Sequence, residues 1–153
     1  MATEIVKEVE AQATVFKLTG TQLLSVGRSD RVVAKSENLT ARIKVYAEGG
    51  ENVIHAHARE EHMFLVLAGQ ATFHLGKEER PQVVNQFEGV LLPAKAYYWF
   101  QSSGDDNLVM FRVGTGKRDG DDRMSTSGAP LPGDSAENKH VDGVPVPGRF
   151  FGA

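Results

Sequence analysis

Apolar and polar residues alternate with a period of two through the centre of the chain. Six short runs carry this pattern and are rich in β-branched and aromatic residues: ARIKVYA (41–47), EHMFLVLAG (61–69), QATFHLG (70–76), EGVLLPA (88–94), YYWFQ (97–101) and NLVMFRVG (107–114). Turn-forming residues separate them, in EGGEN, LGKEERP and SSGDDN. The pattern predicts closely spaced antiparallel strands in a sandwich or barrel, and therefore an all-β fold.

Helical periodicity is absent between residues 41 and 114. One short helix is expected near the start, over TEIVKEVEAQ (3–12). A chain of 153 residues, 41% of them apolar, can bury one hydrophobic core and leaves little room for a second. We therefore expect one domain, with N-terminal strands or an arm over residues 1–39, a barrel core over 40–114 and a C-terminal tail over 115–153.

The composition changes near Gly114. From that residue onward the chain holds half of its 16 glycines and four of its six prolines. The tail is either mostly disordered, or it docks through the apolar residues of VPVPGRFFGA into a groove of its own barrel or of a neighbouring subunit. The second interpretation, together with strand edges that a small barrel must cover, favours a homodimer with Phe150 or Phe151 buried.

Charge and composition exclude several function classes. The net charge of −3 and the pI near 5.9 come from residues spread along the chain without a basic block, so nucleic acid is not an expected partner. No apolar run is long enough for a signal peptide or a membrane span, so we expect a cytoplasmic protein with no membrane partner. The chain has no cysteine, so a metal ion would need nitrogen and oxygen ligands.

Three histidines lie within eight positions of the central region: His55, His57 and His62. His55 and His57 are two residues apart, so on a strand they project from the same face. His62 begins the next strand run, and an antiparallel return of the chain would turn it toward the same interior. Burying three imidazoles without a partner is costly, so their convergence favours a divalent metal site over unrelated core or surface histidines.

This stretch resembles the first sequence motif of the cupin superfamily, usually written G(X)5HXH(X)3-4E(X)6G. Its spacing is followed by Gly49, His55, His57, His62 and Gly69. The resemblance covers roughly residues 40 to 114. It implies a cupin-type double-stranded β-helix (jelly-roll barrel), a metal ion or small molecule inside the barrel, and frequent dimers.

The second cupin motif, G(X)5PXG(X)2H(X)3N, is matched more weakly by FEGVLLPAKAYYWFQSSGDD. Pro93 takes the proline place, Lys95 that of the glycine, Tyr98 that of the histidine and Ser102 that of the asparagine. Tyr98 is therefore expected to face the pocket, as an acid, a base or a hydrogen-bond donor, or else as a weak fourth ligand.

The resemblance also implies a ligand set with two departures. Cupins commonly hold their metal with two histidines and a glutamate from the first motif and a histidine from the second, but here His62 and Tyr98 stand at the last two places. We expect His55, His57 and His62 as ligands, with Glu61 as the alternative; strand alternation favours His62. Three neutral imidazoles would favour an anionic, chelating substrate, and they do not distinguish Fe(II), Zn, Ni, Mn or Cu.

Other polar residues are weaker candidates. Strand alternation adds Phe64 and Phe100 to the expected substrate pocket. The charges of Arg42, Lys44 and Arg112 are expected to be solvated, although any of them that faced the barrel could bind a substrate carboxylate. Arg42 is the one assigned to the expected substrate pocket. Further expectations are a solvated loop pair for Glu60 and Glu61, a strand or surface position for His74 and a tail position for His140.

Three function classes remain open. The favoured one is a metal-dependent oxygenase that acts on a small chelating organic anion, similar to cupins that cleave β-diketones or enolisable substrates with a three-histidine iron. The second is a non-redox metal-dependent isomerase, lyase or hydrolase, and the third is a non-catalytic cupin that binds a small molecule. All three share the same fold and site, so the residues alone do not separate them.

Overall fold

The computed structural model describes residues 9–47, 52–116, 120–132 and 141–153. The strands in these ranges are β1 (Gln22–Val26), β2 (Arg28–Lys35), β3 (Leu39–Tyr46), β4 (Ala56–His57), β5 (His62–Ala68), β6 (Ala71–Leu75), β7 (Arg80–Val84), β8 (Gly89–Leu92), β9 (Tyr98–Ser102), β10 (Leu108–Thr115), β11 (Arg123–Met124) and β12 (Val144–Phe150). Every strand pair is antiparallel.

The six runs predicted from alternation are confirmed as β3, β5, β6, β8, β9 and β10. The predicted turn LGKEERP is wrong in its second half, because the tight turn ends at Glu79 and β7 starts at Arg80. Of the predicted helix, residues 9–12 have no helical structure and the rest lies outside the described residues. In the described part of the chain, no helix is long and apolar enough to cross a membrane.

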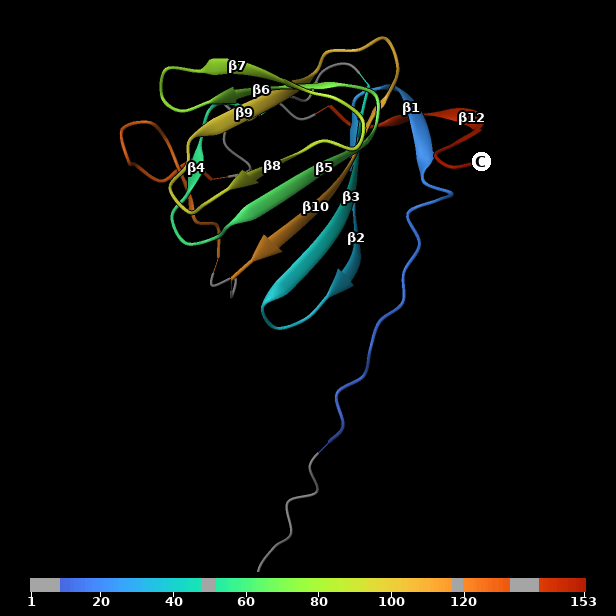
Figure 1. Ribbon diagram of the computed structural model, residues 1–153, viewed down its shortest axis with the longest axis horizontal. Helices are drawn as coiled ribbons and strands as arrows, with labels where there is room; N and C mark the ends of the chain where they lie inside the picture. The colour runs from blue at the N-terminus through green and yellow to red at the C-terminus, as the bar shows by residue number, and fades with distance from the viewer. Residues whose placement is uncertain (1–8, 48–51, 117–119, 133–140) are drawn as a thin grey trace, which may run out of the picture.

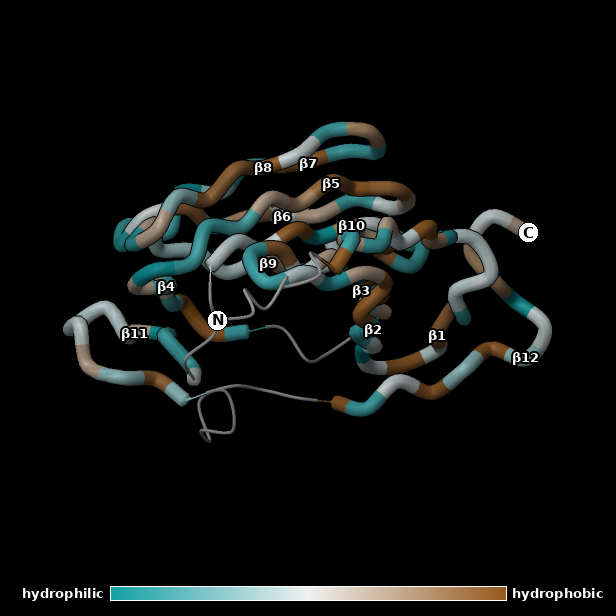
Figure 2. Tube along the Cα trace, turned by 90° about the horizontal axis from the view of Figure 1, so that it is seen from below, coloured by the Kyte–Doolittle hydropathy of each residue, from teal (hydrophilic) through white to brown (hydrophobic). Residues whose placement is uncertain are grey.

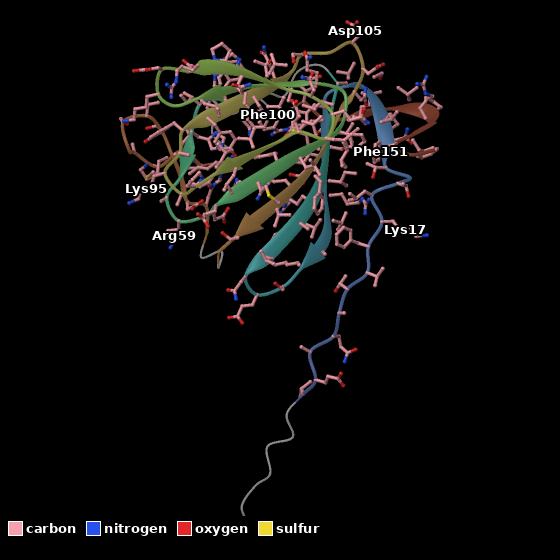
Figure 3. All side chains as sticks on the ribbon, viewed as in Figure 1. Lys17, Arg59, Lys95, Phe100, Asp105 and Phe151 are labelled. Atoms are coloured by element: carbon pink, nitrogen blue, oxygen red, sulfur yellow. The ribbon has the colours of Figure 1, made fainter. Side chains whose placement is uncertain are left out.

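Two sheets face each other across the main core (Figure 1). The larger has the order β2-β3-β10-β5-β8, and the smaller has the order β7-β6-β9. Phe64 of the larger sheet meets Phe73 and Phe100 of the smaller one at ring-centroid distances of 5.5 and 5.4 Å. Figure 3 places Phe100 between the sheets. The protein is thus an all-β jelly-roll barrel, as predicted.

A second apolar cluster lies on the outer face of the larger sheet. It contains Leu24 of β1, Ile43 and Val45 of β3, and Val109 of β10, and Phe151 packs against it. β12 pairs with β1, so the apolar end of the chain reaches this cluster through Phe151, while Phe150 is exposed. Because Ile43 and Val45 are buried on this side, β3 turns its alternate residues toward the barrel interior.

The β1–β12 ribbon and the β4–β11 pair lie at opposite ends of the molecule (Figure 2). β4 is held on two sides, since Arg123 of β11 is the partner of His57, and His55 bridges to Tyr98 at the start of β9. Two backbone hydrogen bonds of 2.9 and 3.1 Å join His55 to Tyr98. This pairing holds His55 and His57 next to Tyr98 at one end of the barrel.

Candidate metal centre

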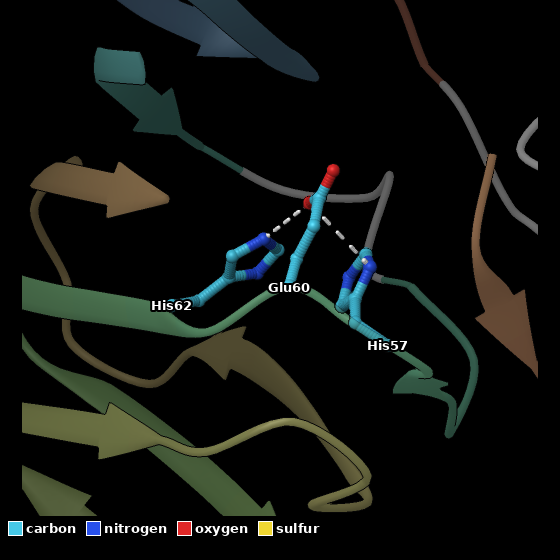
Figure 4. A group of neighbouring side chains, drawn as sticks. All are labelled: His57, Glu60 and His62. Carbon is cyan, nitrogen blue, oxygen red and sulfur yellow. Dashed lines mark hydrogen bonds and ion pairs between the residues drawn. The ribbon is translucent and has the colours of Figure 1, made fainter. Parts of the chain in front are cut away.

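Three side chains at this end of the barrel form a compact group of ligand type: His57, Glu60 and His62. One ligand atom from each lies within 4.8 Å of the other two. Glu60 stands between the two imidazoles, with its Oε2 atom 2.9 Å from His62 Nε2 and 3.8 Å from His57 Nδ1 (Figure 4). We call these three residues, which could hold a metal ion, the metal centre.

The inclusion of Glu60 corrects the expectation that Glu60 and Glu61 form a solvated loop pair. Glu60 is only 7% exposed, whereas Glu61, the alternative ligand predicted from the motif, is exposed and lies outside the group. Strand alternation counted back from His62 puts Glu60 on the same side as His62 and turns Glu61 outward. Period-two alternation could have identified Glu60, because it is two positions before His62 and shares its face, but the motif comparison considered only Glu61 and His62.

His55 and Tyr98 line the same cavity beside the metal centre. The His55 Nδ1 atom lies 2.8 Å from the carbonyl oxygen of Val53, so a neutral ring can donate there and keep the Nε2 lone pair for a ligand. Tyr98 is buried, and its hydroxyl lies 3.3 Å from His62 Nδ1. The structure thus brings all three predicted histidines and Tyr98 to one place, with His55 outside the closest group.

Asp122, in the segment predicted as a tail, joins the metal centre from outside. Its Oδ1 atom lies 2.7 Å from His57 Nδ1, and its Oδ2 atom accepts hydrogen bonds from the backbone amides of Arg59 and Glu60 at 2.9 and 3.1 Å. A carboxylate on Nδ1 orients the ring and leaves Nε2 available to a metal. The sequence analysis missed this residue, because it lies 65 positions after His57 in a polar stretch without periodicity.

Burial keeps the histidines neutral. Desolvation lowers the pKa of His55 and that of His57 to about 4, and in His57 the neighbouring His62 adds to the effect. Burial also lowers the pKa of His62, against the opposing influence of Glu60. Although burial alone would raise it, hydrogen bonds from His57 and from two backbone amides hold the pKa of Asp122 below its usual range. Neutral imidazoles are the protonation state in which histidines bind a metal, and the ionised Asp122 can accept the Nδ1 proton of His57.

The residues present fit a divalent metal ion. His57, His62 and Glu60 supply nitrogen and oxygen donors, and a hydrogen bond now joins His62 Nε2 to Glu60 Oε2 over 2.9 Å. Two ligand atoms that each lie about 2.1 Å from one ion are also separated by roughly 3 Å. Two imidazoles with one carboxylate suit several first-row metals, so the donor set supports a metal site without naming the metal.

A cavity of about 480 Å³ opens beside the metal centre. The predicted pocket residues Arg42, Phe64, Tyr98 and Phe100 all line it. Its walls also contain the charged residues Arg28, Asp30, Lys44, Arg112, Asp121, Asp122 and Arg123. Its volume falls in the range of small-molecule sites.

The expectation of solvated charge on β3 and β10 is wrong for Lys44 and Arg112, each only 8% exposed. Both faces of β3 are covered, so its alternate residues point into the barrel instead of into water. The Lys44 Nζ and Arg42 Nη1 atoms bind one carboxylate, Asp30, at 2.7 and 3.0 Å. The inner face of the larger sheet is therefore strongly cationic next to the metal centre.

Gly114 leaves room for the contact between Arg112 and His62. It faces His62 across β10 and β5. A Cβ atom there would lie 3.1 Å from Arg112 Nη2 and 3.2 Å from His62 Cδ2, closer than side chains normally approach. With glycine at this place, the guanidinium comes within 3.3 Å of His62 Nε2.

The second motif forms a turn at Ala94 and Lys95 in spite of its departures. Lys95, at the glycine place, has a φ angle of 69°, in the left-handed region that glycine adopts most easily. Its amide donates a 2.7 Å hydrogen bond to the carbonyl oxygen of His57. The turn thus braces the histidine motif, at the cost of backbone strain.

His74, one of the weaker candidates, lies away from the cavity. His74 stacks on Trp99 with ring centroids 3.9 Å apart, on the opposite face of β9 from Tyr98 and Phe100. His74 therefore has the strand position that was expected. His140 lies outside the described residues.

Comparison with known proteins identifies the family. The Cupin domain model matches residues 42–114. No curated protein matches the sequence significantly.

Solved structures share the fold at low sequence identity. KdgF from Halomonas sp. is 19% identical, with a TM-score of 0.54 over 61% of this chain and 82% of that one. An uncharacterized double-stranded β-helix protein from Klebsiella pneumoniae is 15% identical, with a TM-score of 0.56 over 65% and 86%. An RmlC-like cupin from Shewanella frigidimarina is 14% identical, with a TM-score of 0.55 over 71% and 95%. Together with the sequence motifs and the jelly-roll barrel, the family match leads to one conclusion: residues 42–114 form a domain of the cupin superfamily.

Proposed function

We propose that this protein is a metal-dependent, oxygenase-like enzyme that acts on a small chelating organic anion. One observation carries the proposal: two imidazoles and a carboxylate gather within 4.8 Å at the wall of a cavity that cationic side chains also line. Two histidines with one carboxylate are the ligand set of many non-haem Fe(II) oxygenases. A bound divalent ion would polarise substrate oxygen atoms, and Fe(II) would also supply redox chemistry with O2.

The side chains of the cavity support substrate binding and orientation. Lys44, Arg42 and Arg112 present cationic groups to an anion, and low exposure to water strengthens their attraction. Phe64 and Phe100 line the same cavity and exclude water from the bound carbon skeleton. Asp122 holds His57 in one orientation and fixes the loop that carries Glu60.

A non-redox isomerase or lyase is the second candidate, and Tyr98 favours it. Burial raises the pKa of Tyr98 well above its usual range, so the phenol keeps its proton at neutral pH. Its hydroxyl lies beside the metal centre, where it can hand a proton to a substrate or take one back.

Metal analysis followed by activity screening tests both candidates. The purified protein is assayed for bound metal, loaded anaerobically with Fe(II), and screened for oxygen uptake with diketones, hydroxyaromatic acids and keto acids. Oxygen uptake with Fe(II) but not with Zn supports the oxygenase, whereas turnover with either metal in the absence of O2 supports the second candidate. A protein that binds metal and ligand without turnover is a binding protein.

Tyr98→Phe separates proton transfer from metal binding. The variant is expected to retain metal and to lose turnover by roughly a hundred-fold or more, the contribution of a general acid or base. Loss of metal as complete as in His57→Ala would make Tyr98 a ligand instead.

A further inference from the structure

Three cationic side chains on the inner face of the larger sheet form a continuous surface next to the metal centre. Arg42 and Lys44 alternate on β3, and Arg112 of β10 is the register partner of Arg42. All three line the cavity. We call Arg42, Lys44 and Arg112 the basic wall. It begins at His62, which Arg112 contacts at 3.3 Å, and extends across β10 to β3.

The basic wall carries more positive charge than its acidic neighbours balance. Asp30 contacts both Arg42 and Lys44, and its side chain is about one-third exposed. The full cavity lining holds five basic residues (Arg28, Arg42, Lys44, Arg112 and Arg123) and four acidic ones (Asp30, Glu60, Asp121 and Asp122), which leaves one excess positive charge. A divalent ion in the metal centre raises the excess to three. A ligand with two negative charges balances most of it.

Buried atoms of two of these cations favour a bound anion. Burial lowers the pKa of Lys44 to about 8, and repulsion from Arg112 and Arg28 adds to this, against the attraction of Asp30. The Nε atom of Arg42 is buried, and no residue in the described ranges accepts its hydrogen bond. A carboxylate oxygen in the cavity satisfies that donor and stabilises the Lys44 ammonium.

Sheet geometry sets the distance between the metal centre and the basic wall, the two places where an anionic group can bind. His62 on β5 and Arg42 on β3 flank β10, and adjacent strands lie about 4.8 Å apart, so the two backbones are about 10 Å apart. Both side chains project from the same inner face of the larger sheet. Phe64 follows His62 by two residues on β5 and shares the cross-strand row of Arg112 and Arg42, where it offers an apolar surface to a short carbon chain.

We propose that the substrate is a small dicarboxylate or similar dianion, with one anionic group at the metal centre and the other on the basic wall. The inference rests on the proposed function, and it narrows the substrate class from an organic anion to an organic dianion. Monoanions of the same length occupy only one of the two places.

Binding of matched acids tests this assignment. The full chain is loaded with Zn²⁺, and the binding of glutarate is compared with that of pentanoate, which has the same number of carbons and one carboxylate fewer. Glutarate is expected to bind about 10- to 100-fold more tightly, the effect of one charge-assisted contact. Succinate and adipate, with butanoate and hexanoate as partners, find the length at which the ratio is largest.

Variants assign the preference to the basic wall. Lys44→Met is expected to reduce the glutarate preference to less than about threefold and to retain Zn²⁺, since Lys44 is not part of the metal centre. Lys35→Met is the matched control, because Lys35 is exposed at the end of β2, and it is expected to keep the full preference. If Lys44→Met does not fold by circular dichroism, Arg42→Met is used in its place.

A second readout follows the proton on Lys44. At pH 8, near the pKa of Lys44, glutarate binding is expected to take up protons, measured by calorimetry in buffers of different ionisation enthalpy. Lys44→Met is expected to abolish most of this uptake.

The outcomes separate this inference from the proposed function. A protein that binds Zn²⁺ but shows no preference for dicarboxylates overturns the inference and leaves the proposed function standing. An equal preference in the wild type and in the Lys44 and Arg42 variants overturns the role of the basic wall. A wild type that binds no metal overturns both.

Discussion

Replacing Asp122 by Asn tests how far the C-terminal segment builds the metal centre. The two carboxylate oxygens of Asp122 accept from His57 Nδ1 and from the amides of Arg59 and Glu60, at distances of 2.7 to 3.1 Å. An asparagine has only one oxygen. Its amino group must face either the imidazole, which then moves its proton to Nε2, or the two backbone amides, which then lose their acceptor.

Either arrangement is expected to weaken metal binding. In the first, the Nε2 lone pair of His57 is lost until the tautomer is restored; in the second, the loop that presents Glu60 loses about 1 kcal/mol for each hydrogen bond. Removal of such an outer carboxylate typically costs 10- to 100-fold in metal affinity. We therefore expect Asp122→Asn to lose about 1.4 to 2.8 kcal/mol of Zn²⁺ binding free energy.

The assay is competition for Zn²⁺ against a chromophoric chelator at pH 7, combined with ¹⁵N NMR of the imidazole tautomers in the metal-free protein. Asp121→Asn is the matched control, since Asp121 is the adjacent aspartate, is exposed and pairs with Arg123. It is expected to change the affinity by less than about threefold. An Asp122→Asn variant that binds Zn²⁺ as tightly as the wild type refutes the reasoning, and equal losses in both variants would mean that net charge, not positioning, sets the affinity.

Three further predictions concern stability and assembly. Lys44 faces Asp30 and Arg28 of β2 and Arg112 of β10, and its pKa in the folded protein is about 8, below the usual 10.5. Between these pH values the unfolded chain binds more protons, so the free energy of unfolding is expected to rise with pH by on the order of 3 kcal/mol. Urea titrations of Lys44→Met should lack this rise. Lys95→Gly is expected to raise the free energy of unfolding by about 0.5 to 1 kcal/mol, because glycine relieves the positive φ, and a thermal melt that does not move upward contradicts this. The homodimer stays a prediction: Leu91 is exposed on the edge strand β8, so light scattering should find Leu91→Glu monomeric and the wild type dimeric, and a monomeric wild type would contradict it.

The alternation of apolar residues determined the strands of the barrel, because a strand with one face toward a core must repeat with period two. The spacing from Gly49 to Gly69 likewise marked the histidine motif, since the motif lies within one short stretch of the sequence. Alternation also placed Phe64, Tyr98 and Phe100 in the cavity, as the structure has them.

Tertiary structure decided which distant segments pack against each face of a strand. β3 alternates in sequence like a half-exposed strand, but β1 and Phe151 cover its outer face, so Lys44 points into the barrel. Pairing of β11 with β4 brings Asp122 to His57, a contact across 65 positions that no local pattern records. Short-range periodicity reports which face a residue takes, whereas the partner opposite that face depends on how distant segments pack, and only the folded chain fixes it.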